Sequence, residues 1–512
     1  MPNTLGLQHL HCLHRVHLLT CWALFAALLL SACGGGGSAG GASSPPPSPG
    51  ASSPPPPAAV SGYAVEGTVS GLVGSGLTLE ICSGGGGPGG GYYPHPPHLP
   101  CHSLLQVSAN GAFTLDSVYP YPAGYSGSEY VVITQQPSSP TQRCVISNAA
   151  VSIQNASNTG VTVSCADYND YSYVTNAADN TLSTYRVDAT TGALTVVGTP
   201  IATGASPYAI VGLDTGDQRF VFVGNEGSND VSAFVVNSAT GALTAVPGSP
   251  FAAGTDPKAM AWATAFEGGY NLYVANAGSD NVSVYAIDYS TGALTALPGS
   301  PVAVGKSPTS IVIDSNLGYA FVANNGGSND ISAFSIDTAG ALIPVPGSPF
   351  PAGGNPLSLE FGVGGKFLYT ANPDATNPSI SGFSIDPTTG ALSPVSGSPF
   401  PLPVSHYMAI EQTGLQTGNL TRGYLYVTTD ASIVGYAFDW TTGALTALPG
   451  FPVAAGANAY SVSIAGNQFL YVANDGAANI SGFTLDLLTG ALTPMAGSPF
   501  PAGKHPEFIT TF

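Results

Sequence analysis

The chain has 512 residues, of which only 7% are charged, and nine Lys plus Arg against 28 Asp plus Glu give a formal net charge of −19. This acidic, arginine-poor composition argues against nucleic acid as a partner, because phosphates need clustered cations, and against electrostatic docking on anionic lipid. Abundant Gly, Pro, Val, Thr, Ser and Tyr, without a long helical period, favour an all-β fold.

The N-terminus carries the pattern of an export signal. Residues 21–30, "CWALFAALLL", form an apolar run too short to span a bilayer, and a region with Arg15 precedes them. The run ends in "LSAC", which resembles the bacterial lipobox. The resemblance implies that residues 1–33 are a lipoprotein signal peptide and that Cys33 is diacylated, which is enough lipid for stable membrane anchoring. A plain signal peptide cleaved nearby is the alternative.

Residues 34–60 are a Gly, Ser and Pro-rich tether, flexible and extended in turn, which would hold the folded parts away from a membrane. Gly34 rather than Asp follows Cys33, and by analogy with lipoprotein sorting in some Gram-negative bacteria this favours the outer membrane, on its periplasmic or surface face. We therefore expect an exported protein, lipid-anchored in the cell envelope.

Residues 61–166 hold short strand patterns separated by Gly, Asn and Pro turns, and resemble the small β-sandwich modules found ahead of other domains in bacterial surface lipoproteins. Four cysteines fall here, an even number that in an exported chain indicates two disulfides. Sequence allows three pairings, and short loops favour Cys82–Cys101 and Cys144–Cys165. The insertion "YYPHPPHLPCH" carries metal-binding residue types, but Cys101 is expected in a disulfide, so we predict neither a metal site nor a cofactor.

A repeat organises residues 167–512. The turn "TGAL" or a close variant occurs seven times, at spacings between 47 and 53 residues; its glycines are Gly192, Gly241, Gly292, Gly340, Gly390, Gly443 and Gly490. Strand motifs such as "YVAN" and loops such as "GSPF" recur in phase seven times. A period near fifty filled with strand signals predicts a seven-bladed β-propeller with four-stranded blades.

The repeat also predicts how one blade is built. Residues 307–350 read as four strands; the first two are nearly continuous apolar runs, which predicts burial on both faces, and "TGAL" is the outer hairpin. The repeat starts on a second strand and residues 505–512 read as a first strand. We therefore expect the C-terminal strand to complete the first blade, closing a monomeric ring that has no exposed edges.

The "YVTN"-type strands, "SNDVSAF"-type third strands and "TGAL" hairpins resemble the seven-bladed lactonase/YVTN propeller family over residues 168–512. The family includes enzymes that open sugar lactones, such as 6-phosphogluconolactonase, and exported propellers with no evident reaction. Lactone hydrolysis needs a base to activate water and cations or donors to hold the oxyanion. In a propeller these groups would lie at the channel mouth built by loops that enter the first strands and follow the second strands.

The entry loops supply the candidate residues. His505 and Glu507 are the best catalytic pair, His406 is a further candidate, and the candidate ligand-binding residues are Lys258, Lys306, Lys504 and Asp256. Phosphosugar lactonases need cations for the phosphate. The arginines of the repeat are Arg186, Arg219 and Arg422, none of which is expected at this mouth.

Two functions remain open from the sequence. The favoured one is an envelope lipoprotein that presents the propeller as a binding or scaffold surface to an unknown envelope protein or a small sugar-like ligand. The alternative is a lactonase-like hydrolase that opens a sugar lactone at the channel mouth.

Overall fold

The computed structural model describes the β-sandwich and propeller strands and most of the loops between them: residues 63–83, 101–118, 129–135, 142–147, 150–151, 158–167, 170–216, 218–265, 269–314, 317–374, 376–403, 407–411, 422–466 and 468–512. The predictions for the signal peptide, Cys33, the tether, most of the His-rich insertion and His406 lie outside these residues.

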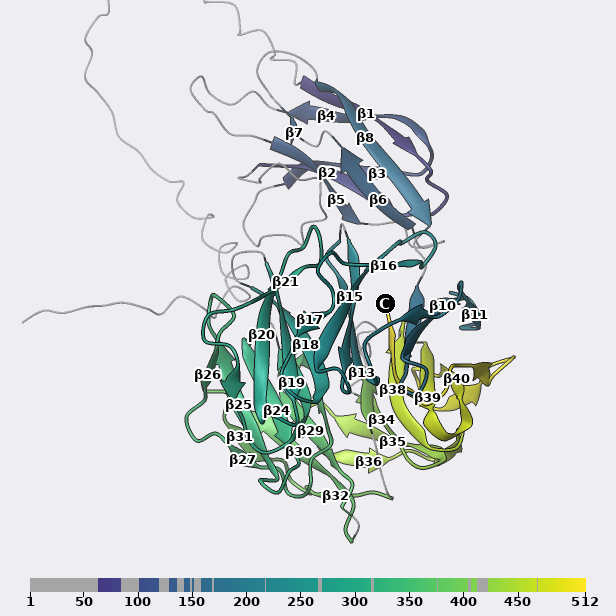
Figure 1. Ribbon diagram of the computed structural model, residues 1–512. Coiled ribbons are helices and arrows are strands. Elements are labelled where there is room, and N and C mark those ends of the chain that lie inside the picture. The colour runs from purple at the N-terminus through teal and green to yellow at the C-terminus, as the bar shows by residue number, and fades with distance from the viewer. Residues whose placement is uncertain are drawn as a thin grey trace, which may run out of the picture. The chain divides into compact units, whose positions relative to one another are not determined.

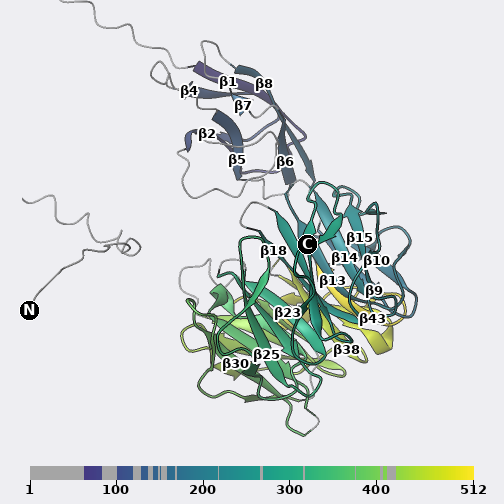
Figure 2. The ribbon, with the colours of Figure 1, turned by 60° about the vertical axis from the view of Figure 1, so that its left-hand side comes forward.

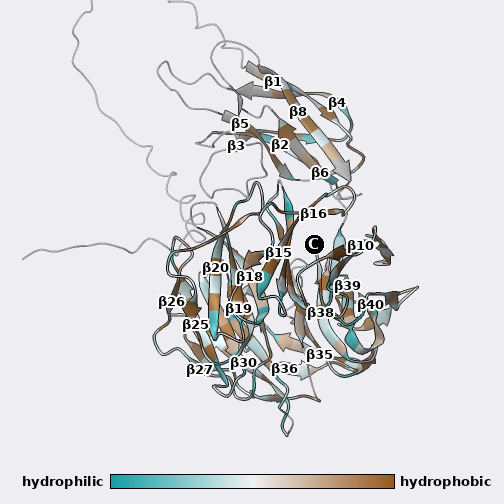
Figure 3. Ribbon diagram, viewed as in Figure 1, coloured by the Kyte–Doolittle hydropathy of each residue, from teal (hydrophilic) through white to brown (hydrophobic). Residues whose placement is uncertain are grey.

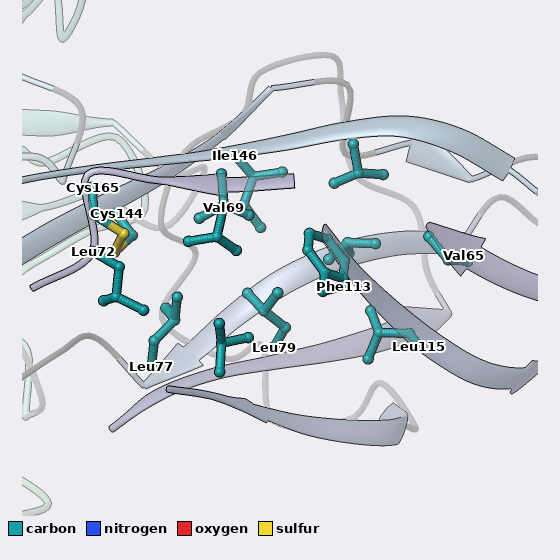
Figure 4. Packing of buried hydrophobic residues seen from close by; sticks show 14 of the residues in the cluster. Val65, Val69, Leu72, Leu77, Leu79, Phe113, Leu115, Cys144, Ile146 and Cys165 are labelled. Atoms are coloured by element: carbon teal, nitrogen blue, oxygen red, sulfur yellow. A yellow bond between two sulfur atoms is a disulfide. The ribbon is translucent and has the colours of Figure 1, made fainter. Parts of the chain in front are cut away.

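The N-terminal part is a β-sandwich of two four-stranded sheets, as expected (Figure 1). The first sheet has the order β4-β1-β8-β6 and the second β3-β2-β5-β7. The strands are β1 (Tyr63–Ser70), β2 (Leu77–Ser83), β3 (Cys101–Val107), β4 (Gly111–Val118), β5 (Glu129–Gln135), β6 (Gln142–Ser147), β7 (Ala150–Val151) and β8 (Asn158–Asp167). Its core is a cluster of aliphatic side chains with Phe113 among them (Figure 4).

A disulfide cross-links two strands of this sandwich. Cys144 and Cys165 face each other on the paired strands β6 and β8 and are joined by an S–S bond at the edge of the core. The second predicted pair, Cys82 and Cys101, stands in register on β2 and β3, but the side chains lie outside the described residues. Its covalent state therefore stays a prediction.

Residues 170–512 form seven antiparallel sheets, the seven predicted blades. We number the blades so that blade 1 holds β9, blade 2 begins with β13, and blades 3 to 7 follow along the chain. The first strands, in blade order, are β43 (Pro506–Thr511), β13 (Pro207–Asp214), β18 (Pro257–Thr264), β23 (Pro308–Asp314), β28 (Ser358–Phe361), β33 (Met408–Glu411) and β38 (Ala459–Ala465). The second strands are β9 (Tyr171–Asn176), β14 (Arg219–Asn225), β19 (Tyr270–Asn276), β24 (Tyr319–Asn324), β29 (Phe367–Asn372), β34 (Arg422–Thr428) and β39 (Phe469–Asn474).

The third strands are β10 (Thr181–Val187), β15 (Asp230–Val236), β20 (Asn281–Ile287), β25 (Asp330–Ile336), β30 (Ser379–Ile385), β35 (Ser432–Asp439) and β40 (Asn479–Leu485). The described helices are two 3₁₀ turns, η1 (Val363–Gly365) and η3 (Asp475–Ala477), and within the described ranges no helix is long and apolar enough to cross a bilayer.

The fourth strand of every blade is broken into two short pieces that pair with the same third strand. The pieces are β11 (Leu194–Val196) with β12 (Ile201–Ala202), β16 (Leu243–Ala245) with β17 (Phe251–Ala252), β21 (Leu294–Ala296) with β22 (Val302–Ala303), β26 (Leu342–Pro344) with β27 (Phe350–Pro351), β31 (Leu392–Pro394) with β32 (Phe400–Pro401), β36 (Leu445–Ala447) with β37 (Val453–Ala454), and β41 (Leu492–Pro494) with β42 (Phe500–Pro501). In five blades the "GSP" serine bridges the break; for example, Ser249 Oγ accepts a hydrogen bond of 2.9 Å from the Ala233 N–H. The serine thus satisfies a backbone donor that the interrupted strand leaves without a carbonyl.

The seven first strands contact one another in cyclic order and surround the channel (Figure 2). The ring closes where β43 pairs with β9, so the C-terminal strand completes blade 1 as predicted. Hydrophobic residues lie along strands of the sandwich and of the whole ring (Figure 3).

Burial separates the first strands from the second. The second strands with complete burial data are buried almost throughout, whereas β23 is buried only at Pro308 and Ile311. The expectation that both inner strands are covered on both faces is therefore wrong for β23, whereas β33 is buried along its whole length. The first strands line the channel, which leaves part of their side-chain surface open to it.

The "TGAL" turns join neighbouring blades. In four blades the tyrosine of the second strand donates a hydrogen bond of 2.6–2.9 Å to the carbonyl of the turn glycine in the next blade: Tyr273 to Gly340, Tyr369 to Gly443, Tyr426 to Gly490 and Tyr471 to Gly192. All seven turn glycines have positive φ, and a Cβ at Gly443 would stand 2.6 Å from the Phe367 ring of the preceding blade. Glycine is required there by the backbone conformation and by the close packing between blades.

We predict that Gly443→Ala lowers the free energy of unfolding by about 1–3 kcal/mol more than Gly450→Ala, because only the first substitution drives a methyl group into the neighbouring blade. The control is matched, since Gly450 also has positive φ (83°), but no atom lies within 4 Å of the position that its methyl group would take. Urea unfolding of both variants measures the difference, and equal losses would show that the turn does not join the blades.

Candidate functional site

The loops that enter the first strands and follow the second strands meet at one end of the ring. In five blades a backbone hydrogen bond of 2.8–3.0 Å joins these two loops. The donor is the N–H that follows the asparagine at the end of the second strand, and the acceptor is a carbonyl of the entry loop: Ala177 to His505, Glu226 to Ser206, Ala277 to Asp256, Asn325 to Ser307 and Asp475 to Asn458. The five entry-loop residues share left-handed φ values between 48° and 59°. Each bond joins two loops of one blade, and the loops of successive blades lie side by side at one mouth of the channel.

Lys258 is the central cation of this mouth. Its Nζ forms an ion pair with Glu226 of the preceding blade and lies 3.8 Å from Asp256 Oδ1. The same ammonium stands 4.1 Å from the centroid of the Tyr208 ring, within range of a cation–π interaction. Because its side chain is only 22% exposed, these contacts hold Lys258 at the channel instead of in solvent.

His505 and Asp475 form a second contact of the same kind. His505 belongs to the entry loop of blade 1, and Asp475 follows the second strand of blade 7, which is the preceding blade in the ring. Nδ1 of His505 lies 2.7 Å from Asp475 Oδ1. The imidazole is 59% exposed, whereas the carboxylate is 15% exposed. His505 therefore lies on the outer rim of the mouth.

Glu507 lies deeper than His505 and is half-buried. Burial raises the pKa of its carboxyl to about 7; Asp475 and Glu226 raise the pKa further, and Lys258 and His505 oppose the shift. A carboxyl with this pKa changes protonation near neutral pH, which suits a general base. Of the predicted catalytic pair, the glutamate has the better environment for proton transfer.

Four aromatic rings cross the channel below this rim. The hydroxyl of Tyr208 bonds those of Tyr407 (2.8 Å) and Tyr460 (2.6 Å), and Phe508 packs against all three rings. Burial raises the pKa of Tyr208 and Tyr407 well above the usual tyrosine value and that of Tyr460 to about 12, so the three phenols stay neutral donors. This aromatic layer (Tyr208, Tyr407, Tyr460 and Phe508) comes from blades 1, 2, 6 and 7.

A cavity of about 190 Å³ lies beside the aromatic layer. Residues of all seven blades line the cavity, including Tyr407 and Phe508 of the aromatic layer. It extends from Lys258 at the mouth to Glu360 on β28. The lining combines aliphatic side chains with polar ones, so it offers both apolar surface and hydrogen-bonding groups.

Glu360 is the carboxyl of this cavity, and sequence reasoning missed it. Burial raises its pKa to about 8, and no hydrogen bond or ion pair of Glu360 occurs among the described contacts. Each first strand has one residue in the same register position as Glu360, and Glu360 is the acidic one among the seven. The others are Val211, Ala261, Val312, Ala409, Ser463 and Thr510. Aligning the repeats by their second strands would have revealed it.

The structure brings together four of the seven candidate residues: Lys258, Asp256, His505 and Glu507. Lys306 and Lys504 lie on entry loops but are 70% and 78% exposed, and contact Asp280 and Asp179 respectively. His406 lies outside the described residues. Sequence reasoning also missed Glu226, Asp475 and the three tyrosines, which belong to the same mouth.

The repeat's arginines lie at the far end of the channel. Arg186 lies opposite Tyr171, the first residue of β9, in the register of the paired strands β10 and β9. Arg219 and Arg422 are the first residues of their second strands, at the end away from the asparagine that closes such strands. Arg219 is buried, with Nε 3.2 Å from Asp214. Within the described ranges, no three His, Cys, Asp or Glu side chains are grouped as a metal site requires.

Comparison with known proteins points to one family. The family described as "Lactonase, 7-bladed beta-propeller" matches residues 141–262 and 214–309. No curated protein matches the chain.

Similar solved structures include a candidate 6-phosphogluconolactonase from Bacteroides fragilis, with 21% identity over 68% of this chain and 98% of that chain, at a TM-score of 0.56. A Lactobacillus plantarum protein has 18% identity over 67% and 99%, at 0.54. The periplasmic gluconolactonase of Pseudomonas aeruginosa has 16% identity over 67% and 99%, at 0.52. These likenesses show the propeller fold.

The environment of Glu360 predicts a pH-dependent effect on stability. In the folded protein its pKa is about 8, above the ordinary value of 4.5. As pH rises from 4.5 to 8 the carboxyl ionises in the unfolded chain but not in the folded one, so the free energy of unfolding falls over this range and the full loss is present above pH 8. Glu360→Gln should therefore gain stability relative to the parent as pH rises from 4 to 9. Thermal unfolding at both pH values measures this, with exposed Glu66→Gln as the control. A difference that does not change with pH would contradict the assigned environment.

Proposed function

We propose that the channel mouth of this propeller, whose sequence matches the seven-bladed lactonase β-propeller family over residues 141–309, hydrolyses an uncharged sugar lactone with Glu507 as the general base. The observation that carries the proposal is the half-buried Glu507 carboxyl, which interacts electrostatically with Lys258, a cation held at the mouth by Glu226. Burial raises the pKa of this carboxyl to about 7. A base and a cation are the two elements that ester hydrolysis needs, and here both lie at one channel mouth, where Lys258 also lines the cavity.

The reaction follows from these groups. The Glu507 carboxylate takes a proton from water as the water oxygen bonds to the lactone carbonyl carbon. Lys258, which lines the cavity, is the donor that can stabilise the resulting oxyanion. The ring C–O bond then breaks, the ring oxygen takes the proton back from Glu507, and the product is the open-chain hydroxy acid.

The charge at the mouth selects against a phosphorylated substrate. Glu226 and Asp256 contact Lys258, Glu507 interacts with it electrostatically, and Asp475 adds a fourth carboxyl group near Glu507. The arginines of the described ring lie at the other end. A phosphate would meet a negative surface without the cationic clamp that it requires. The Pseudomonas aeruginosa gluconolactonase, whose name specifies no phosphate, supports an uncharged lactone as the substrate.

Lactone turnover by the purified protein tests this function. The panel pairs sugar δ- and γ-lactones with their phosphorylated forms and subtracts spontaneous hydrolysis. We expect turnover of the uncharged lactones, a decline in kcat/KM below pH 7 as Glu507 gains a proton, and a loss of about 10²–10⁴-fold in Glu507→Gln.

Lysine and histidine variants complete the test. Lys258→Met should lower kcat, while the control Lys306→Met, at an exposed lysine paired with Asp280, should not. His505→Ala should cost less than tenfold, because the imidazole lies on the rim. Turnover that is unchanged in Glu507→Gln would overturn the assignment of the base.

Binding without turnover is the second function that the site supports. The hydroxyls of Tyr407 and Tyr460 both bond that of Tyr208 below the rim. The charged and polar side chains of the rim suit a sugar-like ligand or an envelope protein. Absence of turnover on every lactone, with recovery of an envelope component that depends on an intact mouth, would favour it.

We also propose that the protein is anchored in the cell envelope by lipid on Cys33. The motif "LSAC" and the tether that follows it support this. Cys33→Ser should abolish incorporation of labelled fatty acid and release the protein from the membrane fraction. A variant that stays in the membrane fraction would contradict the lipid anchor.

A further inference from the structure

The channel cavity contains polar groups that the proposed reaction does not use. Glu360 lies at the end of the cavity away from Lys258, and none of the described contacts neutralises its carboxyl. Because burial raises its pKa to about 8, the carboxyl is mostly protonated at neutral pH and can both donate and accept a hydrogen bond.

A second polar group beside Glu360 is also without a partner. Ser358 lines the same cavity on β28, is 4% exposed, and its Oγ makes no hydrogen bond within the described structure. Three other hydroxyls of the lining are occupied: Ser310 Oγ accepts from Leu359 N–H at 3.0 Å, Ser461 Oγ accepts from Ile509 N–H at 3.2 Å, and Thr309 donates to the Pro356 carbonyl at 3.0 Å. A buried hydroxyl without a hydrogen-bond partner is unfavourable, and a ligand hydroxyl would supply that partner.

We propose that Glu360 and Ser358 form a hydroxyl-binding subsite that makes the cavity selective for polyhydroxylated lactones over unsubstituted ones. This rests on the proposed lactone hydrolysis and identifies the part of the substrate that the channel recognises. The lactone carbonyl lies at Lys258 and Glu507, and the ring hydroxyls extend along blades 3 to 5 toward Glu360.

The dimensions of the cavity agree with a single sugar ring. Its volume of about 190 Å³ is below the range of about 300–1,000 Å³ typical of drug-sized ligand sites. Tyr407 and Phe508 of the aromatic layer bound this space together with residues of the other blades. Aliphatic lining residues such as Ile311 and Leu359 offer the ring an apolar surface and no competing hydrogen bonds.

Specificity constants on two lactones test the subsite in the full chain. D-Glucono-1,5-lactone carries ring hydroxyls and δ-valerolactone carries none. For the parent we expect at least a tenfold preference in kcat/KM for the hydroxylated lactone. Glu360→Ala and Ser358→Ala should each lower kcat/KM for this lactone by about 10–100-fold, mainly through KM, and leave δ-valerolactone within twofold.

Ser310→Ala is the matched control. It removes a hydroxyl at the equivalent position of the neighbouring blade, where the oxygen already serves the Leu359 N–H, so it should not change the preference between the two lactones. Thermal unfolding confirms that each variant is folded. Equal losses on both lactones in Glu360→Ala and Ser358→Ala, or no loss on either, would overturn the subsite.

A non-hydrolysable probe separates failure of the subsite from failure of the proposed reaction. 1,5-Anhydro-D-glucitol keeps the ring hydroxyls but has no carbonyl. If neither lactone is turned over, the proposed reaction fails; calorimetric binding of this probe to the parent, weakened at least tenfold in Ser358→Ala and Glu360→Ala, would still support the subsite. No binding of the probe, or binding unchanged in both variants, would contradict it.

Discussion

The contact between each "TGAL" turn and the preceding blade is the constraint on which the ring depends. A tyrosine hydroxyl such as that of Tyr369 donates to the glycine carbonyl of the next blade, and the same glycine must lack a side chain to fit against Phe367. One hydrogen bond of this kind contributes about 1 kcal/mol. The bond recurs at four of the seven interfaces between blades, and the pairing of β43 with β9 closes the ring.

Ring closure is also what creates the candidate site. Glu226, Lys258, Asp475 and Glu507 are far apart along the chain, and they meet because every entry loop reaches the same mouth. The repeated residues provide the scaffold, while the residues that differ between repeats provide the chemistry. Glu360 illustrates this, because six equivalent positions carry small or aliphatic residues and one carries a carboxyl.

The fold could be predicted from sequence because its markers repeat. The seven turns, the seven "YVAN"-type strands and the closing strand each correspond to an observed element, and the small sandwich was also expected. The break in the fourth strand was not predicted, since "GSPF" reads as a simple turn. The channel-facing exposure of the first strands was missed because an apolar run does not reveal which side faces a channel.

The site was less predictable than the fold. Entry-loop spacing identified His505, Glu507, Lys258 and Asp256, but could not show that Lys258 contacts a carboxylate of the preceding blade. The tyrosines occupy different repeat positions, so their meeting across the channel depends on ring geometry. Tyr208 directly follows the entry-loop proline of blade 2. Tyr407 of blade 6 stands at the register position that Ala209, the residue after Tyr208, holds in blade 2.

The central claim is that the closed ring holds a single-sugar site between Lys258 and Glu360. A crystal structure of the protein soaked with 1,5-anhydro-D-glucitol tests it most directly. The account predicts density for one ring in the cavity, with ligand hydroxyls within hydrogen-bond distance of Glu360 and Ser358 Oγ. An empty channel under conditions where calorimetry detects binding, or a ligand bound elsewhere on the molecule, would contradict it.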